Sequence, residues 1–269
     1  MTSHQITGLR WAMVVAIAAG WEIFPRLGLF DPVFIPPVSR IVETIIQQTR
    51  YGDLWHHAVL STQRALGGLA FAIVIGSLLG FLVGGLFPRT AIVIEPLVQL
   101  LSQANPVVLF HVVLLFFGIG ETAKVFIIAW LCTWPIMFSA IGGILQVDPD
   151  LIKVARSFGL TGISLFRRVV LPAAAPSLLT GIRLSGGYAF VMLVAAEMMG
   201  ASSGLGWFVV QSQESYHAAR IFSGAVVITG LALLLDSVLK RAEGRLIRWR
   251  PSYDERRVLI EDLATGRIS

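Results

Sequence analysis

Residues 65–88 read ALGGLAFAIVIGSLLGFLVGGLFP and contain no Asp, Glu, Lys or Arg over 24 positions. A helix that crosses a bilayer needs about 20 mostly apolar residues. Residues 96–120 and 125–147 are two further windows, of 25 and 23 residues, that lack those charged residue types in the same way. All three windows are too long and too apolar for the core helices of a water-soluble domain, so they predict membrane spans.

The composition of the whole chain agrees with that prediction. Of 269 residues, 55% are hydrophobic and 14% are charged, and the mean hydropathy is +0.77, whereas soluble domains are about 25% charged. The single cysteine, Cys132, excludes a disulfide scaffold. The net charge of +5 comes from basic residues that lie in separate stretches rather than among aromatic residues, which argues against a nucleic-acid partner. The chain is therefore predicted to be an integral membrane protein.

Three weaker apolar stretches flank the strong windows. Residues 11–21 are interrupted at Glu22, residues 169–196 contain Arg183, and residues 221–239 contain Asp236. Counting them predicts an all-α, polytopic membrane protein of about six transmembrane helices. The first helix is predicted to be an uncleaved signal anchor, because the Trp-Glu pair that ends its apolar run does not resemble a cleavage site.

Small residues recur inside the first strong window. Gly76, Gly80 and Gly84 stand four positions apart, which places them on one face of a helix and lets a neighbouring helix approach closely. We interpret this face as a helix-packing surface, with a role in gating as the alternative.

The Lys and Arg residues predict the orientation, because cytoplasmic loops of membrane proteins are enriched in them. With a cytoplasmic amino terminus, 14 of the 21 basic residues lie inside and 6 outside, and Arg183 lies within a span. Both termini are therefore expected in the cytoplasm. Residues 1–56 are expected to form the signal anchor and a periplasmic connector, in which the apolar spacing from Val38 to Ile46 predicts an amphipathic helix at the membrane surface.

The loop between the fourth and fifth spans reads DPDLIKVARSFG over residues 148–159 and carries the signals of a short helix. Asp148 can cap the first free amides, and Pro149 suits the first helical position. Gly159 suits the left-handed residue that ends a helix. One side of this helix is apolar and could pack on the bundle or dock on a partner protein; its residues are Leu151, Ile152, Ala155 and Phe158.

The spacing of this loop resembles the EAA loop of permeases from ATP-binding-cassette (ABC) importers. That family pattern is Glu-Ala-Ala, three residues, Gly, nine residues and Ile-x-Leu-Pro. Here residues 153–155 read KVA, Gly159 follows after three residues, and residues 169–172 read VVLP after nine more. Lys153 and Val154 replace the Glu and the first Ala of the pattern, so this chain has no acidic side chain at that position.

Further segments resemble the nitrate/sulfonate/taurine subfamily of these permeases. The resemblance covers nearly the whole chain and implies a type I permease domain at residues 57–239, followed by a cytoplasmic tail at residues 240–269. The matching segments are FIPP at 34–37, FGIGETAK at 117–124, TGIRL at 180–184, AE at 196–197 and GLG at 204–206.

In that family the loop is a coupling helix, which docks in a groove of a cytoplasmic ATPase. The chain itself has no G-x-x-x-x-G-K-[ST] phosphate loop. The resemblance therefore implies that ATP-Mg binds to a partner, and we expect no cofactor and no enzymatic activity in this chain. It also implies ATPase-coupling roles for Lys153, Val154, Ala155, Phe158, Gly159, Leu171 and Pro172.

The resemblance implies the permease subunit of a bacterial inner-membrane importer for a small anion or organic sulfonate, working by alternating access. Its expected partners are a second permease subunit, two ATPase subunits, an external substrate-binding protein and membrane lipid. The alternative is an ATP-independent secondary transporter or channel, although the chain shows no convincing internal repeat of the kind that secondary transporters have. An intramembrane enzyme would need a catalytic pair at one depth, and the sequence offers none.

Polar residues at membrane depth are costly and therefore mark candidate sites. Arg183 could attract an anion, but we favour pairing with Asp236 or Glu95. Glu197 is expected to organise the turn at residues 202–206, and a packing role is favoured for His111. No metal-ligand cluster and no nucleophile triad are expected. The candidates for the translocation path are Gln103, Asn105, His111, Arg183 and Glu197.

Overall fold

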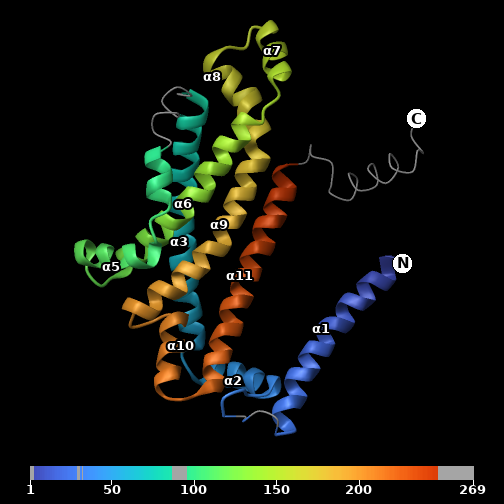
Figure 1. Cartoon of the computed structure of the whole chain (residues 1–269), viewed down its shortest axis with the longest axis vertical. Coiled ribbons are helices and arrows are strands. Elements are labelled where there is room, and N and C mark those ends of the chain that lie inside the picture. Colours follow the sequence, from blue (N-terminus) through green and yellow to red (C-terminus); the bar gives the residue numbers. More distant parts are fainter. Residues whose placement is uncertain (1–2, 29–30, 32, 87–95, 248–269) are drawn as a thin grey trace.

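The protein is a bundle of long helices in a computed structural model that describes residues 3–28, 31, 33–86 and 96–247 (Figure 1). No strand occurs among these residues. Predictions that concern Arg89, Glu95 and the tail at 248–269 lie outside them. In chain order the helices include α1 (Ser3–Arg26), α2 (Val38–Tyr51), α3 (Leu54–Phe81), the short π-helix η1 (Leu82–Leu86), α5 (Pro106–Phe117), α6 (Glu121–Leu145), α7 (Pro149–Ser157), α8 (Gly162–Leu165), the short π-helix η2 (Phe166–Val170), α9 (Leu171–Gly200), α10 (Leu205–Glu214) and α11 (Ala218–Leu246).

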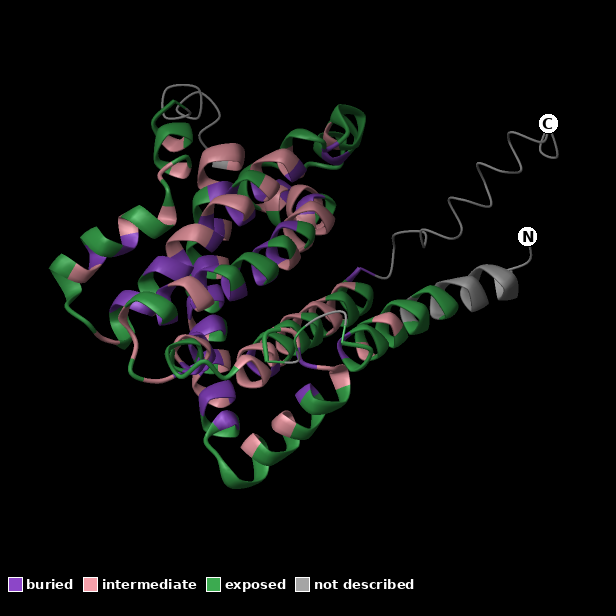
Figure 2. Ribbon diagram, turned by 60° about the horizontal axis from the view of Figure 1, so that its bottom comes forward, coloured by how far each residue is buried: buried purple, intermediate pink, exposed green. Residues whose placement is uncertain are grey.

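The core lies where α3, α6 and α9 pack against one another, with α11 against α9 (Figures 1 and 2). Each of these helices is apolar on most sides, as expected of a helix whose outer surface contacts lipid rather than water. The most buried core side chains come from all three central helices and from α5; they include Leu69, Phe110, Ile127, Ile128, Ile136, Met192 and Leu193.

The glycine face of α3 packs directly on α6. A Cβ added at Gly76 would lie 2.8 Å from the carbonyl oxygen of Thr133, and one at Gly80 would lie 2.9 Å from that of Met137. No side chain fits at these distances, so the two backbones approach closely only because these positions are glycine. The interpretation of this face as a packing surface is confirmed.

Among the described residues, fewer helices meet the criteria for an apolar span than the six that the sequence predicts. Within the described part of the chain, four helical segments are long and apolar enough to cross a membrane, or five if one bent pair counts as a single span. The bent pair is the predicted span at 96–120: its two helices, Pro96–Ser102 and α5, meet at 87°. The bend arises because Asn105 Oδ1 accepts hydrogen bonds from the backbone N–H groups of Val107 (3.0 Å) and Val108 (3.4 Å), which starts a new helix at Pro106.

The amino-terminal helix and the predicted connector lie at the edge of the bundle. α1 leans away from the other long helices, and α2 crosses the end of the bundle beside α11 (Figures 1 and 2). Trp21 joins them: its Nε1 donates to the carbonyl oxygen of Pro36 (3.2 Å), and its ring meets the edge of Phe222 on α11. α2 buries Ile41 and exposes Glu43, which confirms the predicted amphipathic helix.

The segments predicted to face opposite sides of the membrane lie at opposite ends of the bundle. α7 and α8 form one tip, whereas α2 and the connection between α10 and α11 form the other end (Figure 1). α9 extends between these two ends and follows directly on the segment that forms the α7 tip.

Candidate functional site

The predicted short helix at the tip is confirmed as α7, and its local signals act as expected. Asp148 Oδ1 accepts a hydrogen bond from the N–H of Asp150 at 2.8 Å, and Pro149 occupies the first helical position. Gly159 has φ of +80°, where its N–H donates to the carbonyl oxygen of Arg156 at 2.9 Å. A side chain with a Cβ is strained in that conformation, so glycine fixes the point at which the chain turns back towards the bundle.

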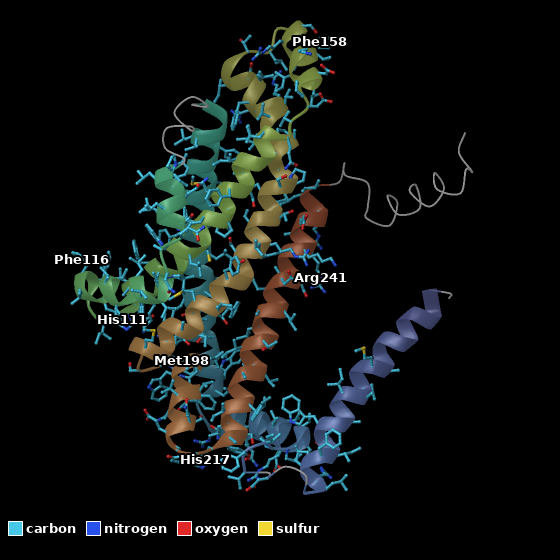
Figure 3. All side chains as sticks on the ribbon, viewed as in Figure 1. His111, Phe116, Phe158, Met198, His217 and Arg241 are labelled. Atoms are coloured by element: carbon cyan, nitrogen blue, oxygen red, sulfur yellow. The ribbon has the colours of Figure 1, made fainter. Side chains whose placement is uncertain are left out.

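α7 presents a mixed apolar surface. Ala155 is buried against the rest of the chain, whereas Leu151 and Val154 are about half exposed and Phe158 is 81% exposed at the outermost tip (Figure 3). Lys153 is exposed and pairs with Asp150 at 2.8 Å. Part of the apolar side therefore packs on this chain and part is exposed. Leu171 and Pro172, at the start of α9, are half-buried.

The residues predicted for the translocation path do not form one cluster. Gln103, Asn105 and His111 lie on the bent segment that ends in α5, where all three are exposed. The His111 ring nitrogen Nδ1 lies 3.1 Å from the carbonyl oxygen of Val107, one turn earlier in its own helix. A role of these residues in the path stays a prediction.

Arg183 is paired rather than free, which confirms the interpretation favoured from the sequence. Its Nε donates to Asp236 Oδ1 at 2.5 Å and its Nη2 donates to Asp236 Oδ2 at 3.1 Å. The pair joins α9 to α11, and both side chains are about 40% exposed. Because its charge is already neutralised by a carboxylate, Arg183 is a weaker candidate for an anion site than a free arginine would be.

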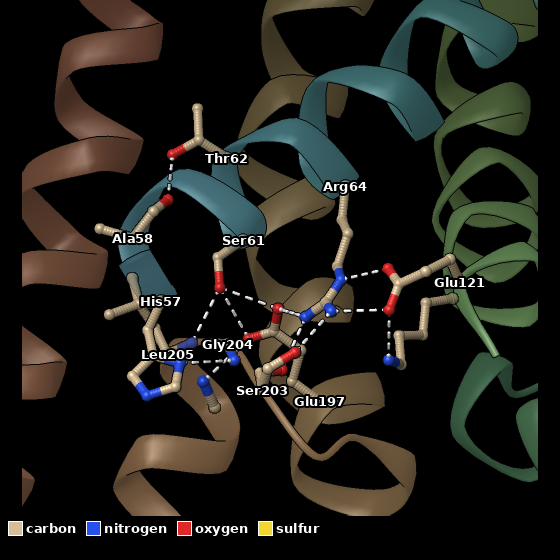
Figure 4. Close-up of polar contacts among 12 residues, drawn as sticks. His57, Ala58, Ser61, Thr62, Arg64, Glu121, Glu197, Ser203, Gly204 and Leu205 are labelled. Atoms are coloured by element: carbon tan, nitrogen blue, oxygen red, sulfur yellow. Dashed lines mark hydrogen bonds and ion pairs between the residues drawn. The ribbon is translucent and has the colours of Figure 1, made fainter. Parts of the chain in front are cut away.

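Glu197, near the other end of α9, is 1% exposed and has partners on every side (Figure 4). Its carboxylate accepts hydrogen bonds from the hydroxyl of Ser61 (2.8 Å), from Nη1 of Arg64 (2.6 Å) and from the N–H of Gly206 (2.9 Å). The last bond confirms that Glu197 organises the turn at 202–206. Ser61 in turn accepts a hydrogen bond from the N–H of Leu205 at 2.8 Å.

Arg64 is the centre of this cluster, whereas the charge pattern of the sequence predicts only an outside positive charge at this position. It is 4% exposed. Its Nε and Nη2 donate to the two carboxylate oxygens of Glu121 at 2.5 and 2.7 Å, and its Nη1 and Nη2 reach the carbonyl and hydroxyl oxygens of Ser203 at 2.7 and 3.1 Å. Lys124 Nζ adds a third cation-to-carboxylate contact, at 3.0 Å from Glu121. We name the set of Ser61, Arg64, Glu121, Lys124, Glu197 and Ser203 the arginine cluster.

The arginine cluster holds together three helices and a loop that are far apart in the sequence. Arg64 comes from α3, Glu121 from the first turn of α6, Glu197 from α9 and Ser203 from the loop that precedes α10. Two cations face two carboxylates, so the charges balance. A buried charge is tolerated only when it is paired and hydrogen-bonded, and here the guanidinium uses all of its polar edges. One sequence signal was present: His57, Ser61 and Arg64 fall on one helix face.

Comparison with known protein families identifies the family to which this chain belongs. A profile described as "Binding-protein-dependent transport system inner membrane component" matches residues 72–248. The chain belongs to this family. It is a multi-pass membrane protein and a transport-system permease, and this membership favours the importer interpretation over an ATP-independent transporter or channel.

Related permeases match over most of their length. The protein named as an aliphatic sulfonates transport permease, SsuC of Bacillus subtilis (strain 168), is 32% identical over 90% of this chain and 87% of its own. The taurine transport system permease TauC of Escherichia coli (strain K12) is 30% identical over 92% of this chain and 91% of its own. The bicarbonate transport system permease CmpB of Synechococcus elongatus is 30% identical over 80% of this chain and 81% of its own.

Solved structures show the same fold at lower identity. A chain of an amino acid ABC transporter crystallised with histidines has a TM-score of 0.57 to this permease, at 17% identity, over 76% of this permease and 97% of its own length. A chain of the inward-facing MetNI methionine ABC transporter has a TM-score of 0.56, at 19% identity, over 72% and 93%. The helical bundle with its α7 tip is therefore the fold of ABC transporter permeases.

Proposed function

We propose that this permease is the translocation subunit of an ATP-driven importer for a small anion or an organic sulfonate. The observation that carries this proposal is the similarity, at 30–32% identity over 80–92% of this chain, to permeases named for aliphatic sulfonates, taurine and bicarbonate. These three substrates share an anionic group with several oxygen atoms, a sulfonate or a carbonate. A small oxyanion is therefore the substrate class that the relatives support.

The proposed assembly contains two copies of this permease, two cytoplasmic ATPase subunits that carry ATP-Mg, and an external substrate-binding protein, in the inner membrane with both permease termini in the cytoplasm. The exposed part of α7 supports the position of the ATPase. A short helix with a capped start and a fixed end is rigid enough to transmit a push, and its exposed Phe158 and Val154 would otherwise be apolar groups outside the bilayer. Coupling is the role proposed for Lys153, Val154, Ala155, Phe158, Gly159, Leu171 and Pro172.

α9 supplies a mechanical connection from the ATPase side to the far end of the bundle. It begins directly after the α7–η2 segment and continues for 30 residues, a length of about 45 Å at 1.5 Å per residue. Glu197 lies three residues before its end. A movement of α7 on ATP binding would therefore move α9, which carries Glu197 of the arginine cluster. Alternating access follows if that movement opens the substrate path to one side of the membrane and closes it to the other.

Transport by reconstituted complexes tests this proposal. The permease is placed in proteoliposomes with the ATPase with which it co-purifies and with its binding protein, and uptake of radiolabelled taurine, ethanesulfonate and bicarbonate is measured. We expect uptake of at least one of these solutes that requires ATP on the ATPase side. Equal uptake from vesicles that lack the ATPase would contradict the proposal and favour a secondary transporter or channel.

A further inference from the structure

The arginine cluster has an uneven distribution of exposure. The side chains of Arg64 and Lys124 are 4% and 5% exposed, whereas the side chain of Glu121, with which both pair, is 62% exposed. The two cations are held in place by the packing around them. Glu121 is held mainly by its contacts with them, so it is the partner that can leave without disturbing the core.

Glu121 lies at the border of two hollows of different character. One, of about 660 Å³, lies between α3 and α6 and is lined by apolar and aromatic side chains that include Phe71, Ile75, Val125, Trp130 and Trp134. The other, of about 630 Å³, lies between the start of α6, the end of α9 and α10.

The second hollow is polar on several sides. It is lined by Lys124 itself, by Ser202 and by Gln211. Glu121 therefore borders both an apolar, aromatic hollow and a polar one, and its carboxylate pairs with two buried cations.

The charges of the cluster define what could take the place of this carboxylate. If Glu121 turns away, Arg64 and Lys124 are left facing the single carboxylate of Glu197, with a net charge of +1. Nε and Nη2 of Arg64 then offer two parallel N–H groups, the arrangement that binds two oxygens of one group. Glu214, which lines the polar hollow, disfavours further negative charge. A monovalent oxyanion fits this site better than a divalent one.

We propose that Glu121 is a displaceable internal counter-ion, and that Arg64 and Lys124 bind the head group of a monovalent organic oxyanion whose apolar tail lies in the hollow between α3 and α6. This inference rests on the proposed function and names its substrate class more narrowly, as an alkanesulfonate-like molecule. An internal carboxylate competes at a high effective concentration, so binding is weak. Weak binding suits a translocation site, which must release what it accepts.

The test measures binding of 1-butanesulfonate to the permease–ATPase complex in nanodiscs, without nucleotide and without the binding protein. Glu121→Gln removes the competing charge but keeps the shape of the side chain, and we expect it to lower the Kd by about tenfold or more. Lys124→Met removes one of the two cations and is expected to raise the Kd at least tenfold. The matched control is Glu22→Gln, the same change in the ion pair of Glu22 with Arg26 at 2.5 Å on α1, with no expected effect.

Two further comparisons test the shape and the charge of the site. Wild type is expected to bind 1-butanesulfonate at least tenfold more tightly than methanesulfonate, because each buried methylene contributes about fourfold, and to bind sulfate more weakly than either. Thr122→Trp fills the apolar hollow beside Glu121, since Thr122 is exposed and lines it, and is expected to remove the preference for the longer chain.

A purely structural role for the arginine cluster predicts the opposite result. In that case Glu121→Gln lowers the thermal stability of the complex and does not lower the Kd. A Kd that is unchanged or raised by Glu121→Gln overturns the proposal. Absence of binding in both wild type and Glu121→Gln overturns it as well. The proposed function is judged separately: ATP-dependent anion uptake by wild type with no effect of Glu121→Gln on binding overturns this site alone. If Lys124→Met does not fold, the Kd of Glu121→Gln still tests the proposal, because the Glu121 side chain is exposed.

Discussion

α9 connects two ends of the molecule that differ in whether their side chains are exposed or are buried and paired within the chain. Before its first residue, Leu171, the chain forms the α7 tip, where Val154 and Phe158 are exposed. Near its last residue, Gly200, Glu197 is 1% exposed and accepts hydrogen bonds from α3 and from the start of α10. The first end therefore leaves apolar surface for a second molecule, whereas the second end satisfies its charges within this chain.

The difference follows from what surrounds each end. A charged side chain that is buried among membrane spans has no water to solvate it and must be paired, so Arg64, Lys124 and Glu197 are joined in a cluster of residues from four separate segments. The α7 tip lies beyond the spans, where an exposed helix is tolerated and an apolar side chain is free to contact a partner. Changes to the buried members of the arginine cluster should therefore lower the stability of the permease, and changes at the tip should affect its assembly with the ATPase.

The largest effect is expected for Glu197→Ala. This change removes the carboxylate that faces Arg64 and Ser61, and it leaves the N–H of Gly206 without its acceptor. Removal of one partner from a buried ion pair costs about 3–5 kcal/mol. We expect a loss of that size in the free energy of unfolding, measured in mixed micelles with increasing SDS, and a large drop in the melting temperature.

Glu214→Gln is the control for that measurement, because Glu214 is an exposed carboxylate at the same end of the molecule. It should change the free energy of unfolding by less than about 0.5 kcal/mol. If Glu197→Ala were no more destabilising than this control, the arginine cluster would not be the element that holds this end of the bundle together.

The two ends also differ in how well the sequence predicts them. The signals for α7 are local: Asp148, Pro149 and Gly159 lie within 12 positions of one another, and each acts on the backbone of its own segment. The helix break at Asn105–Pro106 in the span at 96–120 is also predictable from the sequence, because a helix cap and a proline act on the backbone of their own segment. Its angle of 87° is not, because packing of the two half-helices on the bundle determines that angle.

The arginine cluster could not be assembled from the sequence by such rules. Arg64 and Glu197 are 133 positions apart, and Arg64 and Glu121 are 57 apart, so no periodicity connects them. The only sequence signal is that Ser61 and Arg64 lie on one face of the same helix. Nothing in the sequence indicates the residues of other segments with which they interact. The sequence therefore predicts Arg64 to be one of the outside charges, although it is almost completely buried. The partner of Arg183 is predictable, because Asp236 is the single acidic residue of the neighbouring predicted span at 221–239.

An intermediate effect is expected for Gly159→Val at the α7 end. Gly159 has φ of +80° and no heavy atom within 4 Å of the position of an added Cβ, so the cost comes from the backbone rather than from a clash. A residue with a Cβ in this conformation costs about 1–2 kcal/mol, which the chain can avoid by changing the direction in which it leaves α7. We expect a small loss of stability together with a marked loss of ATP-dependent uptake.

Gly230→Val is the matched control for this prediction. Gly230 also has open space around an added Cβ, but its backbone is helical and its φ is not positive. The control should keep both uptake and ATPase association. If Gly159→Val retained normal uptake and normal co-purification of the ATPase, the orientation of α7 would not matter for coupling.

The smallest effect on stability, and the sharpest test of the comparison, is expected for Phe158→Ala. The Phe158 ring is 81% exposed at the tip, so its removal creates no cavity and should change the free energy of unfolding by less than about 0.5 kcal/mol. If the ring inserts into a groove of the ATPase, however, it is an aromatic anchor of that interface, and its truncation should weaken association by about 2 kcal/mol, close to thirtyfold. Affinity of the detergent-solubilised permease for its ATPase is the measurement that checks this.

The contrast between the α7 tip and the arginine cluster requires that Phe158→Ala changes the affinity for the ATPase without changing the free energy of unfolding. A stable Phe158→Ala permease that has lost its ATPase shows that the tip exists for a partner. If affinity for the ATPase were unchanged, the exposed ring would have to be explained by contact with lipid head groups, and the coupling surface would lie elsewhere on α7, with exposed Val154 and Leu151 as the next positions to truncate.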